Sequence, residues 1–255
     1  MYSILVDVTK CTGCEKCVDA CIMANDLNPG KADYDRAVSK DGLSSNRFLS
    51  LIEIGKDKYA RKSCMHCIEP SCVSACLVGG LTKTEEGPVI YDPDKCIGCR
   101  YCMLSCPFEI PRYEWEKTNP FIKKCNMCFE RLKEGQIPAC VEKCPNNAII
   151  FGEREKMLNL ARKTIRQNKG KYKDHIWGEK EFGGTDVLYI SDVCLKDLGW
   201  TKKAKESIPE MTEPVVEATP VIALSVASGL IGLNWIVNRR NKLAKEKMNN
   251  ESEDE

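Results

Sequence analysis

The chain has 255 residues, 43% hydrophobic and 29% charged, a composition that can form a packed core and excludes intrinsic disorder. Its 38 basic and 37 acidic residues leave a net charge of +1, so no nucleic-acid partner is expected. The unusual number is 17 cysteines, against only two histidines, His66 and His175, which makes cysteine chemistry the first expectation.

The predicted elements are short. Apolar runs predict strands at 4–6, 48–54, 89–91 and 148–151, and single helical turns are expected at 18–23 and 141–144. Residues 153–168 predict a helix that packs over the domain through Met157, Leu158, Ala161 and Ile165. The Gly- and Tyr-containing segment 169–200 is expected to run around the outside. A repeated strand and helix unit of this kind predicts an α+β fold.

Sixteen of the cysteines fall into four groups of four, and Cys194 stands apart. The four motifs, in chain order, are Cys11-x2-Cys14-x2-Cys17-x3-Cys21, Cys64-x2-Cys67-x4-Cys72-x3-Cys76, Cys96-x2-Cys99-x2-Cys102-x3-Cys106-Pro107 and Cys125-x2-Cys128-x11-Cys140-x3-Cys144-Pro145. Complete quartets of this kind predict one metal cluster for each motif.

Three other kinds of cysteine site fit the spacing less well. Disulfide scaffolds are mostly small secreted domains, and cysteines this close in sequence seldom bridge each other. A tetrahedral zinc site uses two separated pairs, so these closely spaced thiolates would overfill it. Covalent c-type haem needs a histidine directly after Cys-x2-Cys, and no histidine follows any of these pairs.

The spacing is typical of bacterial ferredoxins. There, Cys-x2-Cys-x2-Cys binds three corners of one 4Fe-4S cluster, and the fourth cysteine, often before proline, crosses to a neighbouring cluster. The loop between the thiolates points backbone N–H groups at the sulfides. Gly13 and Gly98, each just before the second cysteine of its motif, suit a loop with unusual dihedral angles. We therefore predict four 4Fe-4S clusters.

Crossed ligands require the motifs to work in pairs. The second and third motifs are neighbours in sequence, as in a two-cluster ferredoxin, so by elimination the first pairs with the fourth. The predicted ligand sets are Cys11, Cys14, Cys17 and Cys144; Cys125, Cys128, Cys140 and Cys21; Cys64, Cys67, Cys72 and Cys106; and Cys96, Cys99, Cys102 and Cys76. The spacing determines the sixteen ligands better than it determines their partition.

Residues 218–238 contain no charged side chain. A helix of this length measures about 30 Å, enough to cross a bilayer. Trp235 and the following Arg239 and Arg240 are typical of a membrane interface. Ser225, Gly229 and Gly232 recur at helical spacing, which would let a partner's helix approach closely in the membrane.

The flanking charges predict an orientation. The cations that follow the span outnumber those before it, Lys202, Lys203 and Lys205, which favours a cytoplasmic C-terminus in the inner membrane and a cluster domain on the periplasmic or outer side. Met1–Asp7 has no basic segment and only a short apolar run, so it does not predict a signal peptide. Export would then depend on a partner that carries a signal.

The domain limits follow from these elements. We expect a four-cluster ferredoxin-like domain at 1–152, a helix and extended segment at 153–213, a transmembrane anchor at 214–240 and a charged cytoplasmic tail at 241–255. The fold class is therefore α+β, with two nested dicluster modules and one C-terminal transmembrane helix.

Three segments resemble the four-cluster iron-sulfur subunits of membrane-bound respiratory oxidoreductases: CMHCIEPSCVSAC at 64–76, CIGCRYCMLSCPF at 96–108 and GGTDVLY at 183–189. The chain is most similar to hydrogenase-associated iron-sulfur proteins and then to formate dehydrogenase beta subunits. The resemblance implies a link between a molybdopterin or nickel-iron catalytic subunit and a membrane cytochrome b or quinone-reactive subunit. One departure is Leu77, where the family usually has proline.

The sequence contains no Gly-rich dinucleotide motif, Walker loop or radical Cys-x3-Cys-x2-Cys motif, so we expect no catalytic residue and no substrate site. The predicted function is electron transfer as a non-catalytic subunit of an oxidoreductase. The alternative is a soluble polyferredoxin that serves several enzymes. His66 is expected near a cluster or at the surface rather than as a ligand, and Cys194 is expected as a buried structural thiol.

Overall fold

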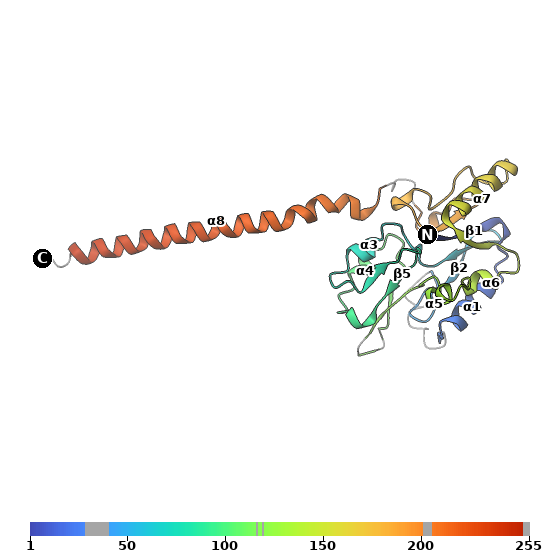
Figure 1. Ribbon diagram of the computed structural model, residues 1–255, viewed down its shortest axis with the longest axis horizontal. Helices are drawn as coiled ribbons and strands as arrows, with labels where there is room; N and C mark the ends of the chain where they lie inside the picture. The colour runs from blue at the N-terminus through green and yellow to red at the C-terminus, as the bar shows by residue number, and fades with distance from the viewer. Residues whose placement is uncertain (29–40, 116, 119, 201–205, 252–255) are drawn as a thin grey trace. The chain divides into compact units, whose positions relative to one another are not determined.

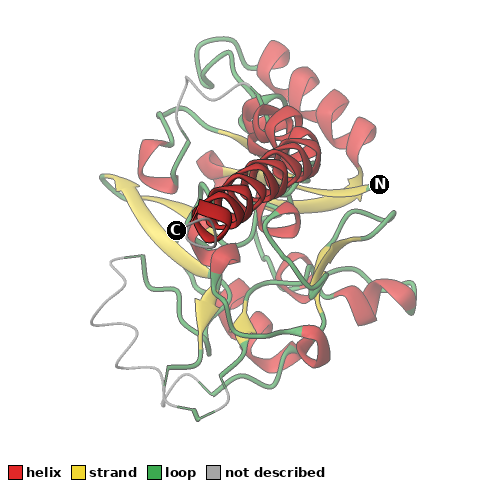
Figure 2. Cartoon of the chain, turned by 90° about the vertical axis from the view of Figure 1, so that its left-hand side faces the viewer, coloured by secondary structure: helices red, strands yellow, loops and turns green. Residues whose placement is uncertain are grey.

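A computed structural model describes residues 1–28, 41–115, 117–118, 120–200 and 206–251. The chain divides into two compact units, Met1–Pro209 and Glu210–Glu255. Within the first unit, short strands and helices are joined by long loops (Figure 2). This mixture of helix and strand confirms the α+β prediction.

The central sheet of the first unit has the strand order β8-β1-β9. Strand β1 (Tyr2–Asp7) pairs antiparallel with β8 (Ile149–Glu153) and parallel with β9 (Val187–Ile190). All four residues of β9 are buried. The expectation that 169–200 runs around the outside is therefore wrong. Its apolar run pairs with β1 inside the domain, and a strand buried on both faces reads as a continuous apolar run.

The two faces of this sheet have different neighbours. Leu5 and Leu188 pack against Met157, Leu158 and Ala161 of helix α7 (Arg154–Gln167), which confirms the predicted helix at 153–168. The opposite face carries Ile4, Val6, Val187 and Tyr189, which belong to a core cluster that also contains Cys17, Cys21, Cys64, Cys125 and Cys140. One face of the sheet thus supports the cysteine-rich region.

Three hairpins and a set of short helices complete the first unit. The hairpins are β2 (Ser50–Gly55) with β3 (Lys58–Lys62), β4 (Leu81–Lys83) with β5 (Val89–Tyr91), and β6 (Arg112–Tyr113) with β7 (Ile122–Lys123). The short helices are α1 (Lys16–Ala24), α3 (Ser71–Ser74), α4 (Tyr101–Ser105), α5 (Phe129–Lys133) and α6 (Ala139–Glu142), with 3-10 turns η1 (Val8–Lys10), η3 (Pro93–Lys95), η4 (Glu181–Gly183) and η5 (Lys196–Leu198). Helix α1 packs against α6, and α3 against α4 (Figure 1).

These bounds agree with most of the predicted elements. Strands β1, β2, β5 and β8 lie at the four predicted positions, and α1 contains the predicted helical turn at 18–23. Helix α6 begins and ends two residues earlier than the predicted turn at 141–144, so Cys140 lies in the helix and Cys144 follows it. Pro138 at its N-cap sets this start, because its fixed φ suits the first turn of a helix.

The second unit is formed by one long helix, α8 (Ile208–Glu251), drawn orange to red in Figure 1. Over Ile208–Ala244 this helix is long and apolar enough to cross a membrane, which confirms the predicted apolar span. Arg239 lies over the ring of Trp235 at 5.3 Å, and the Ser225 hydroxyl donates to the Val221 carbonyl oxygen at 2.8 Å. The predicted limits at 152, 213 and 240 stay predictions.

Candidate functional site

Each of the four motifs bends at the same place. The residue before the second cysteine has a positive φ in every case: 72° at Gly13, 47° at His66, 70° at Gly98 and 57° at Met127. The glycines confirm the expected loop geometry. His66 and Met127 were not foreseen, because non-glycine residues rarely adopt this conformation. Alignment of the four motifs with one another is the signal that could have found them.

The first and third motifs repeat a longer unit. Asp7 and Asp92 each cap a 3-10 turn by accepting a hydrogen bond from the backbone N–H two residues on, at 3.1 Å in both turns. The cysteine loop follows, and then α1 or α4 begins after a left-handed residue, Glu15 or Arg100. The same local chemistry therefore presents the thiols twice.

The structure brings Cys11, Cys14, Cys17 and Cys144 together as quartet A. These four thiols line one cavity, to which Arg61 and Pro145 also contribute. Burial raises the pKa of Cys11, and the neighbouring Cys144 and Cys14 raise it further. Burial likewise raises the pKa of Cys17 to about 12.

Quartet B contains Cys21, Cys125, Cys128 and Cys140. Burial raises the pKa of Cys21, and the other three thiols, which lie close to it, raise it further. The backbone N–H of Met127 donates to the Cys125 sulfur at 3.3 Å, and the Asn25 side chain donates to the Cys21 sulfur at 3.7 Å. Helix α1 thus contributes Cys17 to one quartet and Cys21 to the other.

Quartet C contains Cys64, Cys67, Cys72 and Cys106, and quartet D contains Cys76, Cys96, Cys99 and Cys102. The pKa of Cys67 is raised well above its ordinary value by burial and then by the other three thiols of quartet C. The pKa of Cys102 is raised to about 11 by burial and then by the other three thiols of quartet D. The Gly80 N–H donates to the Cys76 sulfur at 3.2 Å.

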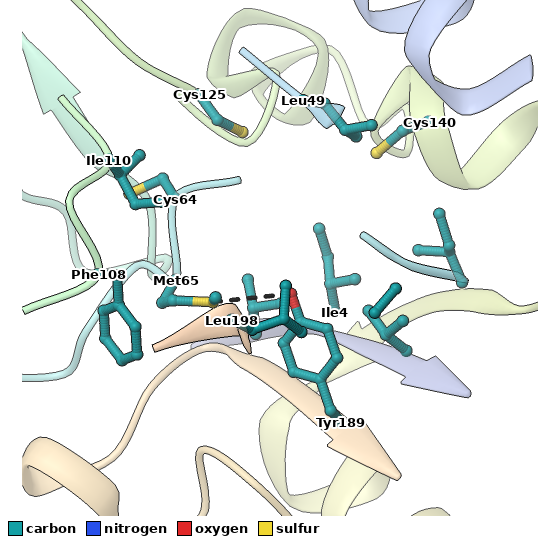
Figure 3. Packing of buried hydrophobic residues seen from close by; sticks show 14 of the residues in the cluster. Ile4, Leu49, Cys64, Met65, Phe108, Ile110, Cys125, Cys140, Tyr189 and Leu198 are labelled. Carbon is teal, nitrogen blue, oxygen red and sulfur yellow. Dashed lines mark hydrogen bonds between the residues drawn. The ribbon is translucent and has the colours of Figure 1, made fainter. Parts of the chain in front are cut away.

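The quartets follow one another in the order A, B, C, D. In three places a cysteine of one quartet lies near a cysteine of the next quartet: Cys17 near Cys140, Cys125 near Cys64, and Cys72 near Cys102. Figure 3 shows Cys64, Cys125 and Cys140 of the middle quartets in one region of the core. The neighbouring thiols are those of the four predicted sets, and which of them bind a given cluster stays a prediction.

These residues fit a sulfide-containing cluster better than a single ion. Among the described residues, no three His, Cys, Asp or Glu side chains are grouped as a single metal ion requires. In quartet A the thiols instead surround a cavity, and in quartets B and D backbone N–H groups donate to cysteine sulfurs. Thiolate ligands with surrounding N–H donors are the usual environment of an iron-sulfur cluster.

Charged and polar side chains lie beside the thiols. His66 is 1% exposed, so it lies inside and not at the surface, and its Nδ1 accepts a hydrogen bond from the Val89 N–H at 2.9 Å. Burial, followed by the charges of Lys124 and Lys83, holds the pKa of His66 well below its ordinary value, so its ring is neutral. The sequence had left open whether His66 lies near a cluster or at the surface, and the structure places it inside.

Two lysines near quartet C are bound to other protein groups. Lys83 donates to the His66 carbonyl oxygen at 3.1 Å and to the Asp186 carboxylate at 2.5 Å. Lys124 donates to the carbonyl oxygens of Val89 and Cys125. Neither lysine was foreseen from the sequence, because a lone lysine in a strand or loop usually lies at the surface.

Cys194 is exposed, which corrects the expectation of a buried structural thiol. Its neighbour Leu195 occupies the buried position, with 1% exposure, in the turn that precedes η5. The chain therefore turns Cys194 outward, away from the core that Leu195 joins.

Comparisons with known proteins agree with this arrangement. A model of the 4Fe-4S dicluster domain matches residues 56–154. A protein of Nitratidesulfovibrio vulgaris is 38% identical over 96% of this chain and 69% of its own length. The hydrogenase-2 operon protein HybA of Escherichia coli O157:H7 is 35% identical over 94% of this chain and 84% of its own length.

A further relative is the iron-sulfur subunit of the nitrate-inducible formate dehydrogenase of Escherichia coli K12, which is 35% identical over 73% of this chain and 66% of its own length. These relatives are identical enough, and cover enough of the chain, to establish a common family. The chain belongs to the 4Fe-4S dicluster family of iron-sulfur subunits that includes HybA and the formate dehydrogenase iron-sulfur subunits.

Proposed function

We propose that the chain binds four 4Fe-4S clusters, one at each of quartets A to D, and serves as a non-catalytic electron-transfer subunit. The observation that carries this proposal is the continuous order of the quartets. Each of quartets A to C has one cysteine that lies near a cysteine of the next quartet. When bound, such clusters accept and release single electrons. The protein's own part is to hold them in sequence and keep water away from the buried thiolates.

The proposed ligands are the four thiols of each quartet. In each set, three ligands come from one motif and the fourth crosses from its paired motif. Cys144 and Cys21 cross between the first and fourth motifs, and Cys106 and Cys76 between the second and third. The first and fourth motifs meet although the other two lie between them in sequence, since Cys11 and Cys144 line the same cavity.

The proposed partners lie at the two ends of this order. One is a catalytic subunit of hydrogenase or formate dehydrogenase type, as the names of the relatives suggest. The other is a membrane cytochrome b or quinone-reactive subunit, reached through α8 as a single membrane span. Helix α8 carries no histidine, so it cannot supply an axial imidazole to haem, and the acceptor must lie on another polypeptide.

The basic residues after the span favour a cluster domain on the outer side of the inner membrane and a cytoplasmic C-terminus. Labelling of cysteines introduced on either side of α8, with a membrane-impermeant thiol reagent and intact cells, would test this orientation. If a cysteine introduced in the C-terminal tail were labelled in intact cells, the orientation would be the reverse of the one proposed.

Metal analysis tests the proposed cofactors. Anaerobically reconstituted protein should contain about sixteen iron and sixteen acid-labile sulfide per chain, as four cubanes require. Zinc as the main metal, or about eight iron, would contradict the proposal. Resistance of the membrane-bound protein to alkaline carbonate separates an anchored subunit from a soluble polyferredoxin, which carbonate would release.

A pair of matched variants tests the membrane partner. Gly229→Leu with Gly232→Leu fills the small-residue side of α8, where a side chain would meet nothing within 4 Å in the isolated chain. Ala223→Leu with Ala227→Leu adds similar bulk on the opposite side of the helix. The glycine pair should abolish quinone reduction but retain reduction of a soluble dye, and the alanine pair should retain both. If the glycine and alanine double variants had equal quinone-reducing activity, α8 would serve only as a membrane anchor.

A further inference from the structure

Arg61 is a buried cation, and two of the three nitrogens of its guanidinium lack hydrogen-bond partners in the described part of the chain. It lies in β3 with 1% of its surface exposed, and its Nε and Nη1 have no hydrogen-bond partner among the described residues. A buried charge without compensation costs several kcal/mol. An arginine cannot avoid this cost by losing its proton. Nε and Nη1 are therefore available to acceptors that the described residues do not supply.

The surroundings of Arg61 indicate these acceptors. Its side chain lines the quartet A cavity together with Cys11, Cys14, Cys17 and Cys144. It also lies near Cys125 and Cys140 of quartet B, and its charge opposes the rise in the pKa of Cys17, Cys21, Cys125 and Cys128 that burial causes. Arg61 thus lies at the quartet A cavity and near the thiols of quartet B.

Tyr189 of β9 helps to hold Arg61 in place. Its hydroxyl donates to the Arg61 carbonyl oxygen at 2.8 Å, and Tyr189 itself is completely buried. Figure 3 shows Tyr189 in the core opposite Cys125 and Cys140. Because β9 pairs with β1, the sheet positions the strand that carries Arg61.

We infer that Arg61 donates hydrogen bonds from Nε and Nη1 to sulfur atoms of the clusters at quartets A and B, and that its charge raises the reduction potentials of both. This inference rests on the proposed function. Reduction adds a negative charge to a cluster, so a nearby buried cation stabilises the reduced form. A planar guanidinium can present separate N–H groups to two acceptors at once, which an ammonium group does less well.

Quartets C and D have no equivalent buried cation with unpartnered donors among the described residues. The buried donors without a partner there, His66 Nε2 and the Tyr91 hydroxyl, are neutral. The nearby ammonium groups of Lys83 and Lys124 already donate to carbonyl or carboxylate oxygens. Arg100, which follows Cys99, lies over the rings of Tyr113 and Trp115 at 5.3 and 5.1 Å. The effect of Arg61 should therefore be confined to two of the four centres.

Redox titration followed by electron paramagnetic resonance tests the charge. Arg61→Met keeps an unbranched, flexible apolar stem and removes the charge. At a fixed ambient potential, the reduced-to-oxidised ratio of two centres should fall about tenfold or more, which for one electron is about 59 mV. The other two centres should not change. Arg162→Met, which removes a cation of α7 paired with Glu179 away from the thiols, is the matched control and should leave all four potentials in place.

A labelling experiment on the unaltered chain tests the hydrogen bonds even if Arg61→Met loses its clusters. With ¹⁵N-arginine, pulsed electron paramagnetic resonance of the reduced protein should show a ¹⁵N coupling. Arg61→Lys should remove this coupling, and Arg100→Lys should retain it. The inference is overturned by a fully loaded Arg61→Met with unchanged or uniformly shifted potentials, or by no ¹⁵N coupling in the wild type. An iron content near eight in the wild type would instead contradict the proposed function.

Discussion

Quartets A and B differ from quartets C and D in what surrounds them, although the cysteine loops of the two pairs are alike. All four loops bend through a positive φ, and the first and third motifs share the same capped turn. The A and B pair packs against the central sheet, as Cys64 of quartet C does, and contains Arg61, whose Nε and Nη1 have no partner among the described residues. The C and D pair lies beside the hairpin β4-β5, where lysines bind protein oxygens.

The difference shows that a repeated cysteine loop does not by itself determine the surroundings of its thiols. The loops supply similar thiols and N–H donors, whereas the neighbouring strands decide whether a cation faces the thiols or is used to hold the chain together. Exposure does not separate the two ends of this order, since Cys14 of quartet A is exposed and Ile97 and Leu104 beside quartet D are 64% and 84% exposed. The buried charge of Arg61 at quartet A is what makes the two ends unlike.

The largest expected effect comes from removal of a crossing cysteine. Cys144→Ala should alter the centre of Cys11, Cys14 and Cys17, whereas Cys106→Ala should alter the centre of Cys64, Cys67 and Cys72. An open corner should give a three-iron signal by electron paramagnetic resonance. Exposed Cys194 provides the control, and Cys194→Ala should keep about sixteen iron.

We call the A and B pair and the C and D pair the two halves. The halves bind their clusters independently only if the variant of a crossing cysteine in one half leaves both centres of the other half unchanged. A Cys144→Ala signal that maps to the centre of Cys125, Cys128 and Cys140 would refute the proposed partition of ligands.

The next largest effect is expected at Lys83, the structural cation of the C and D half. Lys83→Met leaves the completely buried Asp186 with Arg154 at 3.7 Å as its remaining cation. Breaking a buried pair in this way costs roughly 3–5 kcal/mol, which denaturant midpoints would measure. The double variant Lys83→Met with Asp186→Asn should recover part of that loss, because no uncompensated carboxylate remains.

The same variant has a pH dependence of known sign. Burial, the largest influence, already raises the pKa of Asp186 above its ordinary value, and Lys83 opposes that rise. Without Lys83 the pKa rises further, so the deficit in stability should be full at high pH and shrink as pH falls and Asp186 takes up a proton. A deficit that grows on acidification would show that Asp186 is not its source.

A smaller effect is expected at Gly13 and Gly98, which hold the same position in the cysteine loops of the first and third motifs. Gly13→Ala places a methyl carbon 2.7 Å from the Tyr59 ring, and Gly98→Ala places one 2.9 Å from the Tyr113 hydroxyl. The positive φ alone costs roughly 1–2 kcal/mol for a residue with a Cβ. Both variants should lose stability by similar amounts. Tyr59→Ala should partly rescue the first but not the second, and rescue of both would mean that no local contact is involved.

The smallest effect is expected at Asp41, which links strand β3 to strand β6. Asp41 accepts hydrogen bonds from Arg112 of β6 at 2.9 and 2.8 Å and forms an ion pair with Lys62 of β3 at 2.7 Å. Burial raises its pKa, but the two cations outweigh burial and leave the pKa below its ordinary value. Asp41→Asn should cost about 1 kcal/mol at neutral pH.

This difference should stay constant down to the ordinary aspartate pKa of about 3.9 and disappear as pH falls through the lowered folded-state value. Urea midpoints of the two proteins at several pH values would measure it. A difference that persists in strong acid would mean that the lost contribution is not ionic.

The sequence predicted most of what depends on local pattern. Cysteine spacing is a property of neighbouring residues, so the motifs, the bends at Gly13 and Gly98 and the helix α7 could be read directly. Strand β9 could not, because the same apolar run suits a surface loop, and only its pairing with β1 places it inside. Arg61 was missed for a related reason. In Lys-Tyr-Ala-Arg-Lys it reads as a surface charge, and its burial depends on thiols from distant motifs.

The central sheet also sets an order of assembly. The Ser3 hydroxyl donates to the Asp186 carbonyl oxygen across 183 residues, so β1 finds its last neighbour only when most of the chain has been synthesised. Closing so long a loop is slow compared with pairing the adjacent second and third motifs. A new chain should therefore take up iron at quartets C and D first. Ribosome-stalled chains that end within α7 should hold iron there, while quartet A still lacks strand β9, whose Tyr189 hydroxyl donates to the carbonyl oxygen of Arg61 beside the cavity.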